Sequence, residues 1–244
     1  MLLRSFTVCA LLAAAATPVA GQPAPASVEI AVRHERRLAD RPGTLVLTPT
    51  AIEFRATDSR WSRRWPYAEL KQIAVRDDRT IAVGTYEDRS RLMLAADRTF
   101  VFRTTAAIDP ALVQALVAHA GRALVTTVLP PLPPSPRFGV PARHEQRRRS
   151  AFGELRLYDD ALVFAADQRA ASRYWRLTDV EAVLPLDRFR LQVTTREDGL
   201  HPYTFVLPAE IPAGFYDALW TAVNRPRPLG APDGDCGCGA DEKP

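Results

Sequence analysis

The chain has 244 residues, of which 47% are hydrophobic and 25% charged, a composition that excludes a fully disordered protein. The formal net charge is only +4, and basic residues alternate with acidic ones, so no nucleic-acid partner is expected. The sequence has no G-x-S-x-G, H-E-x-x-H, Walker or dinucleotide-binding pattern; we therefore predict no enzyme activity and no cofactor.

The first 21 residues predict a secretory signal peptide. Arg4 precedes an apolar run over 8–16, and small residues follow around Ala20 and Gly21, where cleavage is expected. The run is shorter than the about 20 apolar residues that a spanning helix needs. We expect an exported protein, periplasmic or secreted, that is soluble once this segment is removed.

A charged phrase near the start of the mature chain recurs further along. VRHERR at 32–37 is matched by ARHEQR at 142–147, and residues 33–88 align without a gap with 143–198, at 18 identical positions. A constant offset over this length indicates a tandem duplication. The predicted organisation is a signal peptide (1–21), a first unit (28–127), a proline-rich linker (128–141), a second unit (142–226) and a flexible tail (227–244). The linker composition favours an extended polyproline II spacer.

The first unit is predicted to contain short strands followed by one helix. Residues 43–54 alternate apolar and polar around Thr48-Pro49-Thr50, which is typical of a hairpin. A short strand at 63–67, a single turn at 68–70 and strands at 71–75, 79–88 and 98–104 follow. Asp109 and Pro110 then begin a helix, which Gly121 ends. The second unit repeats this plan.

Six or seven short antiparallel strands closed by one C-terminal helix resemble a pleckstrin-homology-like (PH-like) barrel, especially the GRAM-type and bacterial PH-like variants. The resemblance is carried by the hairpin at Gly43–Phe54, the stretch Trp65–Ile73 and the terminal helix, with the same pattern in the second copy. It implies an α+β, mainly β protein with two tandem small antiparallel barrels, each closed by a C-terminal α-helix. Proteins with this fold include lipid binders, peptide binders and scaffolds.

The resemblance also marks candidate anion-binding residues. In lipid-binding members of that superfamily, basic residues on the first strands and their loop contact phosphates, and arginine forks suit phosphate oxygens. The corresponding residues here are Arg33, Arg36, Arg37, Arg41, Arg143, Arg147, Arg148 and Arg149. Glu35 and Glu145 interrupt both runs, so the alternative is an ion-paired, solvent-exposed edge strand.

Two recurring residue pairs are interpreted as structural. His34 and His144 lack a second ligand at metal-binding spacing, so we expect hydrogen-bonded, partly buried histidines rather than metal ligands. Trp65 and Trp175 are expected to anchor the two cores.

Cys236 and Cys238 form a C-x-C in the glycine- and aspartate-rich tail. A strained disulfide, a soft-metal site for Cu(I) and linkage to another chain all remain open for this pair.

From the sequence we predict a non-catalytic exported binding or scaffolding protein whose two units engage a protein or peptide partner. The first alternative is peripheral binding to anionic lipid headgroups at a membrane surface through the arginine-rich first strands. The second is a redox or soft-metal role of the Cys-x-Cys tail. Nothing in the sequence determines the oligomeric state.

Overall fold

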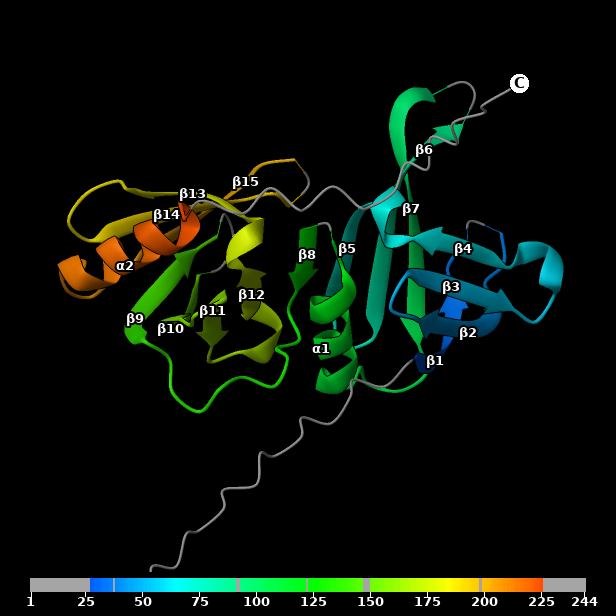
Figure 1. The fold of residues 1–244 in the computed structure, drawn as a ribbon, viewed down its shortest axis with the longest axis horizontal. Coiled ribbons are helices and arrows are strands. Elements are labelled where there is room, and N and C mark those ends of the chain that lie inside the picture. Colours follow the sequence, from blue (N-terminus) through cyan, green and yellow to red (C-terminus); the bar gives the residue numbers. More distant parts are fainter. Residues whose placement is uncertain are drawn as a thin grey trace, which may run out of the picture.

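The computed structural model describes residues 27–36, 38–90, 93–121, 123–146, 150–197 and 199–225, with the backbone alone over 88–90 and 93–96. The signal peptide, Arg37, Arg147–Arg149 and the Cys-x-Cys tail therefore lie outside the described residues. The described chain is mainly β, with two α-helices (Figure 1).

The N-terminal half contains eight strands and one helix. Its elements are β1 (Val28–His34), β2 (Arg41–Leu47), β3 (Ala51–Ala56), β4 (Arg63–Pro66), β5 (Leu70–Asp77), β6 (Thr80–Ser90), β7 (Met93–Thr104), α1 (Pro110–His119) and β8 (Ala123–Thr126). The predicted hairpin, the turn after Pro66 and the helix start at Pro110 are all confirmed. The Asp109 side chain accepts a hydrogen bond from the Ala111 N–H at 2.8 Å, as an N-cap residue should.

The C-terminal half repeats this arrangement, and its described residues, which end at 225, include no counterpart of β8. Its elements are β9 (Phe138–Glu145), β10 (Ala151–Leu157), β11 (Ala161–Ala166), β12 (Arg173–Arg176), β13 (Val180–Pro185), β14 (Arg190–Thr195), β15 (His201–Val206) and α2 (Ala213–Val223). The strand order β4-β3-β2-β1-β7-β6-β5 in the first half corresponds, strand for strand, to β12-β11-β10-β9-β15-β14-β13 in the second. The two copies of the sequence repeat thus form the two halves of the structure. Strand β9 already begins at Phe138, inside the segment expected to be linker.

The short strand β8 joins the two halves into one sheet. It runs parallel to β5, from Gln72 opposite Ala123 to Val75 opposite Thr126, and on its other side Thr126 pairs with Tyr174 of β12. All 15 strands therefore form one continuous sheet, with β13 and β4 at its two ends. Two closed barrels were expected, and this part of the fold prediction is wrong. Because β8 takes the edges of β5 and β12, neither half closes on itself through hydrogen bonds.

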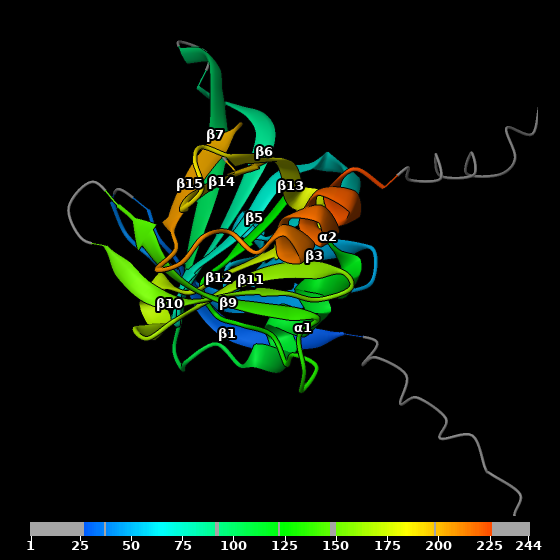
Figure 2. The same cartoon turned by 90° about the vertical axis from the view of Figure 1, so that its left-hand side faces the viewer.

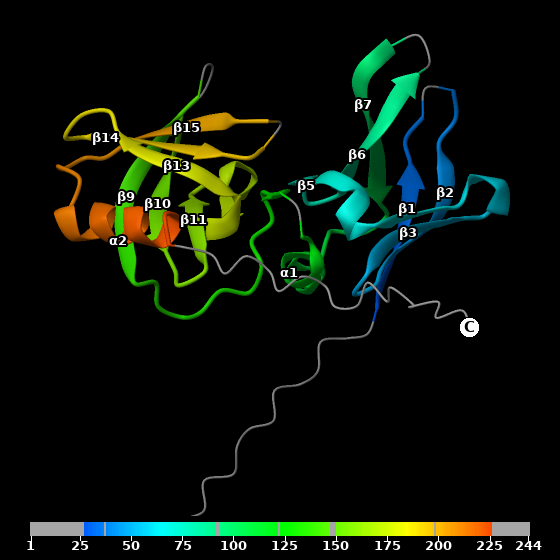
Figure 3. The same ribbon diagram turned by 45° about the horizontal axis from the view of Figure 1, so that its top comes forward.

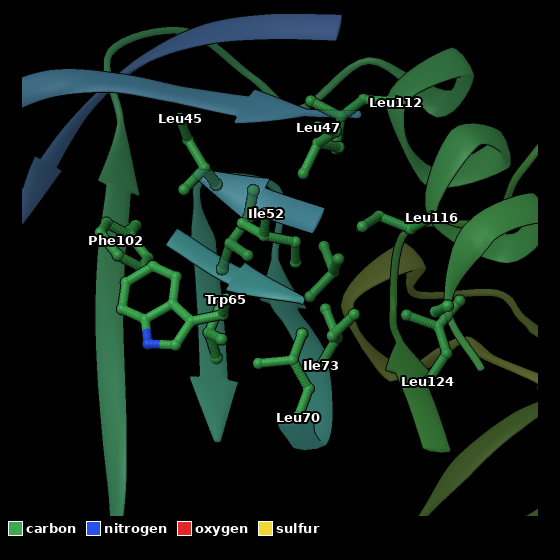
Figure 4. Packing of buried hydrophobic residues seen from close by; sticks show 14 of the residues in the cluster. Leu45, Leu47, Ile52, Trp65, Leu70, Ile73, Phe102, Leu112, Leu116 and Leu124 are labelled. Carbon is green, nitrogen blue, oxygen red and sulfur yellow. The ribbon is translucent and has the colours of Figure 1, made fainter. Parts of the chain in front are cut away.

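Each half curls around its own apolar core. In the N-terminal half, side chains from the bent sheet converge on Trp65 and Phe102, and helix α1 covers one end with Leu112 and Leu116 (Figure 4). Leu124 of β8 belongs to the same core. The second core is built around Trp175, Phe205 and the α2 residues Phe215 and Leu219. Both tryptophans are almost fully buried, as the sequence predicted.

The long β6–β7 hairpin is an asymmetric feature of the first half. It projects beyond the rest of the sheet (Figures 1 and 3), and the second copy lacks the corresponding residues. Figures 2 and 3 show the two halves, joined by the sheet, from two further directions.

Candidate functional site

Two of the predicted basic residues meet at an exposed tryptophan. The Arg41 guanidinium carbon lies 3.1 Å from the ring centroid of Trp61, and that of Arg36 lies 5.1 Å away. Stacking of this kind holds a guanidinium by cation–π attraction and leaves its donors available. Leu38, at the tip of the same β1–β2 loop, is 99% exposed. The loop therefore combines two cations, an aromatic ring and an apolar tip.

The charges in this cluster are not balanced within it. Arg60 pairs with Asp58 at 2.7 Å, but among the described residues no carboxylate forms an ion pair with Arg36 or Arg41. Partial desolvation lowers the pKa of Arg41 from its usual value, and the positive charge of Arg36 adds to this effect. The Arg41 Nε atom is also inaccessible to solvent and has no hydrogen-bond partner in the described part of the chain. An anion would therefore find an excess of positive charge here.

The corresponding loop of the second half is built differently. Gln146, Ala151 and Ala171 stand at the positions of Arg36, Arg41 and Trp61. Of the other predicted arginines that the structure describes, Arg143 is paired with Glu145 at 3.1 Å, as the edge-strand alternative implied. Arg33 is exposed on β1, and the neighbouring Glu35 pairs with Arg103 at 2.8 Å. Of the predicted arginines that the structure describes, Arg36 and Arg41 are thus the two that it brings together.

The recurring histidines lie in equivalent aromatic surroundings. The His34 ring is 5.5 Å from Phe54 and 5.1 Å from Phe102, and the His144 ring is 5.9 Å from Phe164. Burial, together with nearby positive charge, lowers the pKa of each histidine from 6.5 to about 4. The Gln146 amide lies 3.1 Å from Nδ1 of His144. The described residues show no equivalent hydrogen bond for His34, so the expectation of one in both copies is met only in the second.

Two negative findings apply to the described residues alone. They contain no group of three or more histidine, cysteine, aspartate or glutamate side chains that could hold a metal ion. None of their helices has the length and apolar character needed to cross a membrane.

The junction between the halves has a buried polar centre. Arg176 of β12 pairs with Asp179 at 2.7 Å, and both side chains are largely buried. The Arg176 guanidinium donates to the carbonyl oxygen of Ala120 at the end of α1, and Asp179 accepts from the Leu124 N–H of β8 at 3.4 Å. The corresponding residues of the first half are Pro66 and Glu69. This ion pair is therefore specific to the second copy and ties it to the first.

Around this centre the junction is apolar. A small cluster on the outer face of the second half, formed by Tyr158, Ala161, Val163 and Tyr174, receives Val117 from α1 together with Leu129 and Leu132 of the linker. On the opposite side of β8, Val125 covers Ala74 and Ala82 of β5 and β6. Ala74 is consequently only 8% exposed. The β5 edge of the first half is thus fully used within the chain.

The equivalent edge of the second half, on β13, has no strand beside it among the described residues. The Leu186 N–H donates to the Arg190 carbonyl, which makes 184/192 and 182/194 the hydrogen-bonded pairs with β14. The N–H and C=O of Val183 and the C=O of Pro185 therefore point outward. Leu184, at the position of Ala74, is 53% exposed.

Sequence reasoning missed three parts of these surfaces: Trp61, strand β8 and the exposed β13 edge. Trp61 is absent from the second copy, so the repeat gave no signal for it. The apolar segment ALVT that forms β8 was visible at 123–126, but its partners, β5 and β12, lie about 50 residues away on either side.

No protein-family model matches the chain, and no curated protein matches it. The solved structures that are similar to this chain include the following two. One, described as the C-terminal domain of an unknown protein from Leishmania infantum, has 18% identity and a TM-score of 0.29, covering 37% of this chain and 80% of that one. The other, described as the Spt16D Pob3N heterodimer, has 11% identity and a TM-score of 0.31, covering 75% of this chain and 97% of that one. Both scores are below 0.5, so neither structure assigns the chain to a family.

Proposed function

We propose that this chain is a non-catalytic, exported binding protein built from two PH-like units, and that the second unit engages a protein or peptide partner through the edge of β13. One observation carries the proposal. The same edge occurs twice in the chain. In the first half β8 occupies it, whereas in the second half no strand of the described residues pairs with it.

An exposed strand edge presents unpaired backbone donors and acceptors, and an extended segment from a partner can add to it. The internal example on β5 supports this use, because there the edge holds a strand of only four residues. In this arrangement the first unit acts as a support. Its docking surface is used to hold the second unit, whose own surface remains available.

The test is site-specific photo-cross-linking in the producing cell. A photoreactive residue in place of Leu184 should form an adduct with another protein. The same residue in place of Phe152, which is 62% exposed on β10, should not. No adduct at position 184, in a chain that is exported and folded, would refute the proposal.

A second candidate function is favoured by the cluster of Arg36, Arg41 and Trp61. Two guanidiniums that form no ion pair among the described residues lie beside an exposed aromatic ring and the apolar tip Leu38, a combination that suits an anionic membrane surface. The second half also carries an exposed aromatic residue, Phe152, near the start of β10.

Vesicle flotation tests this candidate. The mature chain should float with anionic and not with neutral vesicles, and binding should weaken from low to moderate salt. The double substitution Arg36→Gln/Arg41→Gln should abolish it. A matched control is Arg55→Gln/Arg64→Gln, which removes two exposed arginines of β3 and β4. Equal loss with the control pair would show that net charge, and not this cluster, is responsible.

A further inference from the structure

We infer that the cleft between the two halves binds the acidic segment 230–242 of the same chain, which lies outside the described residues. The inference goes beyond the proposed function and does not depend on it, because residues 182–185 of β13 do not line this cleft.

Both halves contribute to the cleft. Lys71 and Tyr86 come from β5 and β6 of the first half, whereas Thr178 precedes β13 and Arg196 follows β14 in the second. Together with their neighbours these residues surround a volume of about 580 Å³. Cavities of this size between two units of a fold are common binding sites.

The accessible charges in the cleft are positive. The side chains of Lys71 and Arg196 are 40% and 50% exposed. Among the described lining residues the carboxylate is that of Asp179, which is only 8% exposed and already accepts hydrogen bonds from Arg176 and from the Leu124 N–H. A carboxylate that enters the cleft therefore finds charged donors on both halves.

The existing partners of these two cations do not prevent such binding. Lys71 pairs with Asp97 and Arg196 with Glu181, but neither carboxylate lines the cleft, and both pairs are exposed to solvent. Exposed ion pairs contribute little to stability, so the exchange of one carboxylate for another costs little. Both side chains also have several donors, which allows each to bind a second carboxylate.

The segment has the complementary charge. Residues 230–242 contain four carboxylates, Asp233, Asp235, Asp241 and Glu242, and no basic residue. Two or more of these carboxylates can bind at once, one to Lys71 of the first half and one to Arg196 of the second. The bound segment would then bridge the two halves.

The segment also starts close to the cleft. It follows α2, and α2 packs against the turn Leu177–Asp179, which contributes Thr178 and Asp179 to the lining. Asp233 comes eight positions after Arg225, the last described residue, and eight extended residues span up to about 26 Å. A tether of this length gives a roughly millimolar effective concentration, so contacts that are individually weak suffice.

Carbodiimide coupling of the mature chain, residues 22–244, tests this inference. The reagent joins an amine to a carboxylate in contact with it and does not react with arginine, and the chain has only two lysines, Lys71 and Lys243. At low salt, mass spectrometry of the digested protein should find an amide between Lys71 and a carboxylate of residues 230–242. The yield should fall from low to moderate salt.

Matched variants separate the cleft from general charge. Arg196→Glu should remove most of this product, whereas Arg188→Glu, which alters an exposed pair on the β13–β14 turn, should leave it unchanged. The double variant Lys71→Arg/Arg55→Lys moves the amine to an exposed position of β3 and should give no product with the segment. Since these variants leave β13 intact, the in-cell cross-link at position 184 should persist in all of them.

Four results would overturn the inference. In the first, Lys71 couples to Asp97 and to none of the four carboxylates. In the second, the lysine at position 55 couples to the segment as well as Lys71 does, so that the segment has no preferred place. In the third, the coupled chains are dimers, which would make the segment of a second copy the occupant. In the fourth, a photoreactive residue at position 184 of the purified chain labels residues 226–242, which would place the segment on β13.

Discussion

Acidification should destabilise this protein through its two buried histidines. In the folded state the pKa of His34 and that of His144 are each lowered from 6.5 to about 4, so both rings are neutral at pH 5. In the unfolded chain each ring takes up a proton below about pH 6.5. The unfolded state therefore binds more protons between pH 6.5 and 4, and the free energy of unfolding falls as the pH falls through this window.

The magnitude follows from the two pKa values. A difference of 2.5 units, at 1.36 kcal/mol per unit, sets a limit near pH 4 of about 3.4 kcal/mol for each histidine, and at pH 5 about 2 kcal/mol is lost. Urea unfolding of the mature chain at pH 7.5 and pH 5.0 measures this loss. His34→Leu and His144→Leu keep a similar side-chain volume among the same phenylalanines and remove the titrating group. Each should reduce the pH-dependent loss by about 2 kcal/mol, whatever it does to stability at pH 7.5.

All variants share the same surface carboxylates. The difference between variants in the stability lost from pH 7.5 to 5.0 therefore reports the histidines alone. The reasoning is refuted if His34→Leu and His144→Leu lose as much stability between pH 7.5 and 5.0 as the wild type. Such a result would mean that protonated histidine is tolerated in the folded cores, either beside the arginines or through opening of the aromatic cluster.

Three further predictions concern backbone packing, the junction and the tail. Gly43→Ala should lower the free energy of unfolding by more than about 1 kcal/mol, because a Cβ there overlaps a backbone carbonyl oxygen of β3. Gly121→Ala should be tolerated, because a Cβ at that position has no atom within 4 Å. Equal losses of stability in the two variants would contradict this packing. Asp179→Ala should lower the free energy of unfolding by about 3 kcal/mol, because it leaves the buried Arg176 guanidinium without its carboxylate. Asp187→Ala should have little effect, because it removes an exposed ion pair of the same sequence spacing, at 2.6 Å. A similar loss of stability in both variants would mean that the junction pair is exposed to solvent. Deleting residues 231–244 should leave the in-cell cross-link to β13 intact, whereas its loss would support a role for the Cys-x-Cys tail in binding.

Local structure was predictable from the sequence because local chemistry determines it. Pro66 ends one strand, Asp109 and Pro110 begin a helix, and alternating apolar residues define the first hairpin. The duplication added long-range information, since two copies with the same pattern had to share one fold. It also favoured a structural role for His34 and His144; both are buried among aromatic rings, and the expected hydrogen bond is found only for His144.

The junction and the binding surfaces could not be predicted in the same way, because they depend on where the two copies differ. Arg176 and Asp179 replace Pro66 and Glu69, and neither change marks a contact until α1 and β8 are placed beside them. The exposed edge was equally hidden. β13 and β5 have similar sequence patterns, and only the location of β8 makes one covered and the other open. Arg36 and Arg41, two of the residues predicted to contact an anion, converge on Trp61, which has no counterpart in the repeat; anion binding by them stays a prediction.

The position of β8 also gives the chain a fixed polarity. This strand completes the core of the first half with Leu124 and at the same time contacts the first residues of β12, so the first half and β8 together form the surface on which the second half assembles. Because the N-terminal copy is synthesised first, all residues of this surface are present before the C-terminal copy is complete. Exchanging the order of the two copies would keep every residue of both cores and yet remove the junction. The ion pair of Arg176 and Asp179 would then come before α1 and β8, which it now contacts. Glu53 and Arg64, which stand at the positions of Val163 and Tyr174, would face α2 in their place. What began as two equivalent copies is therefore now a directional pair, in which β8 of the first copy joins the two halves.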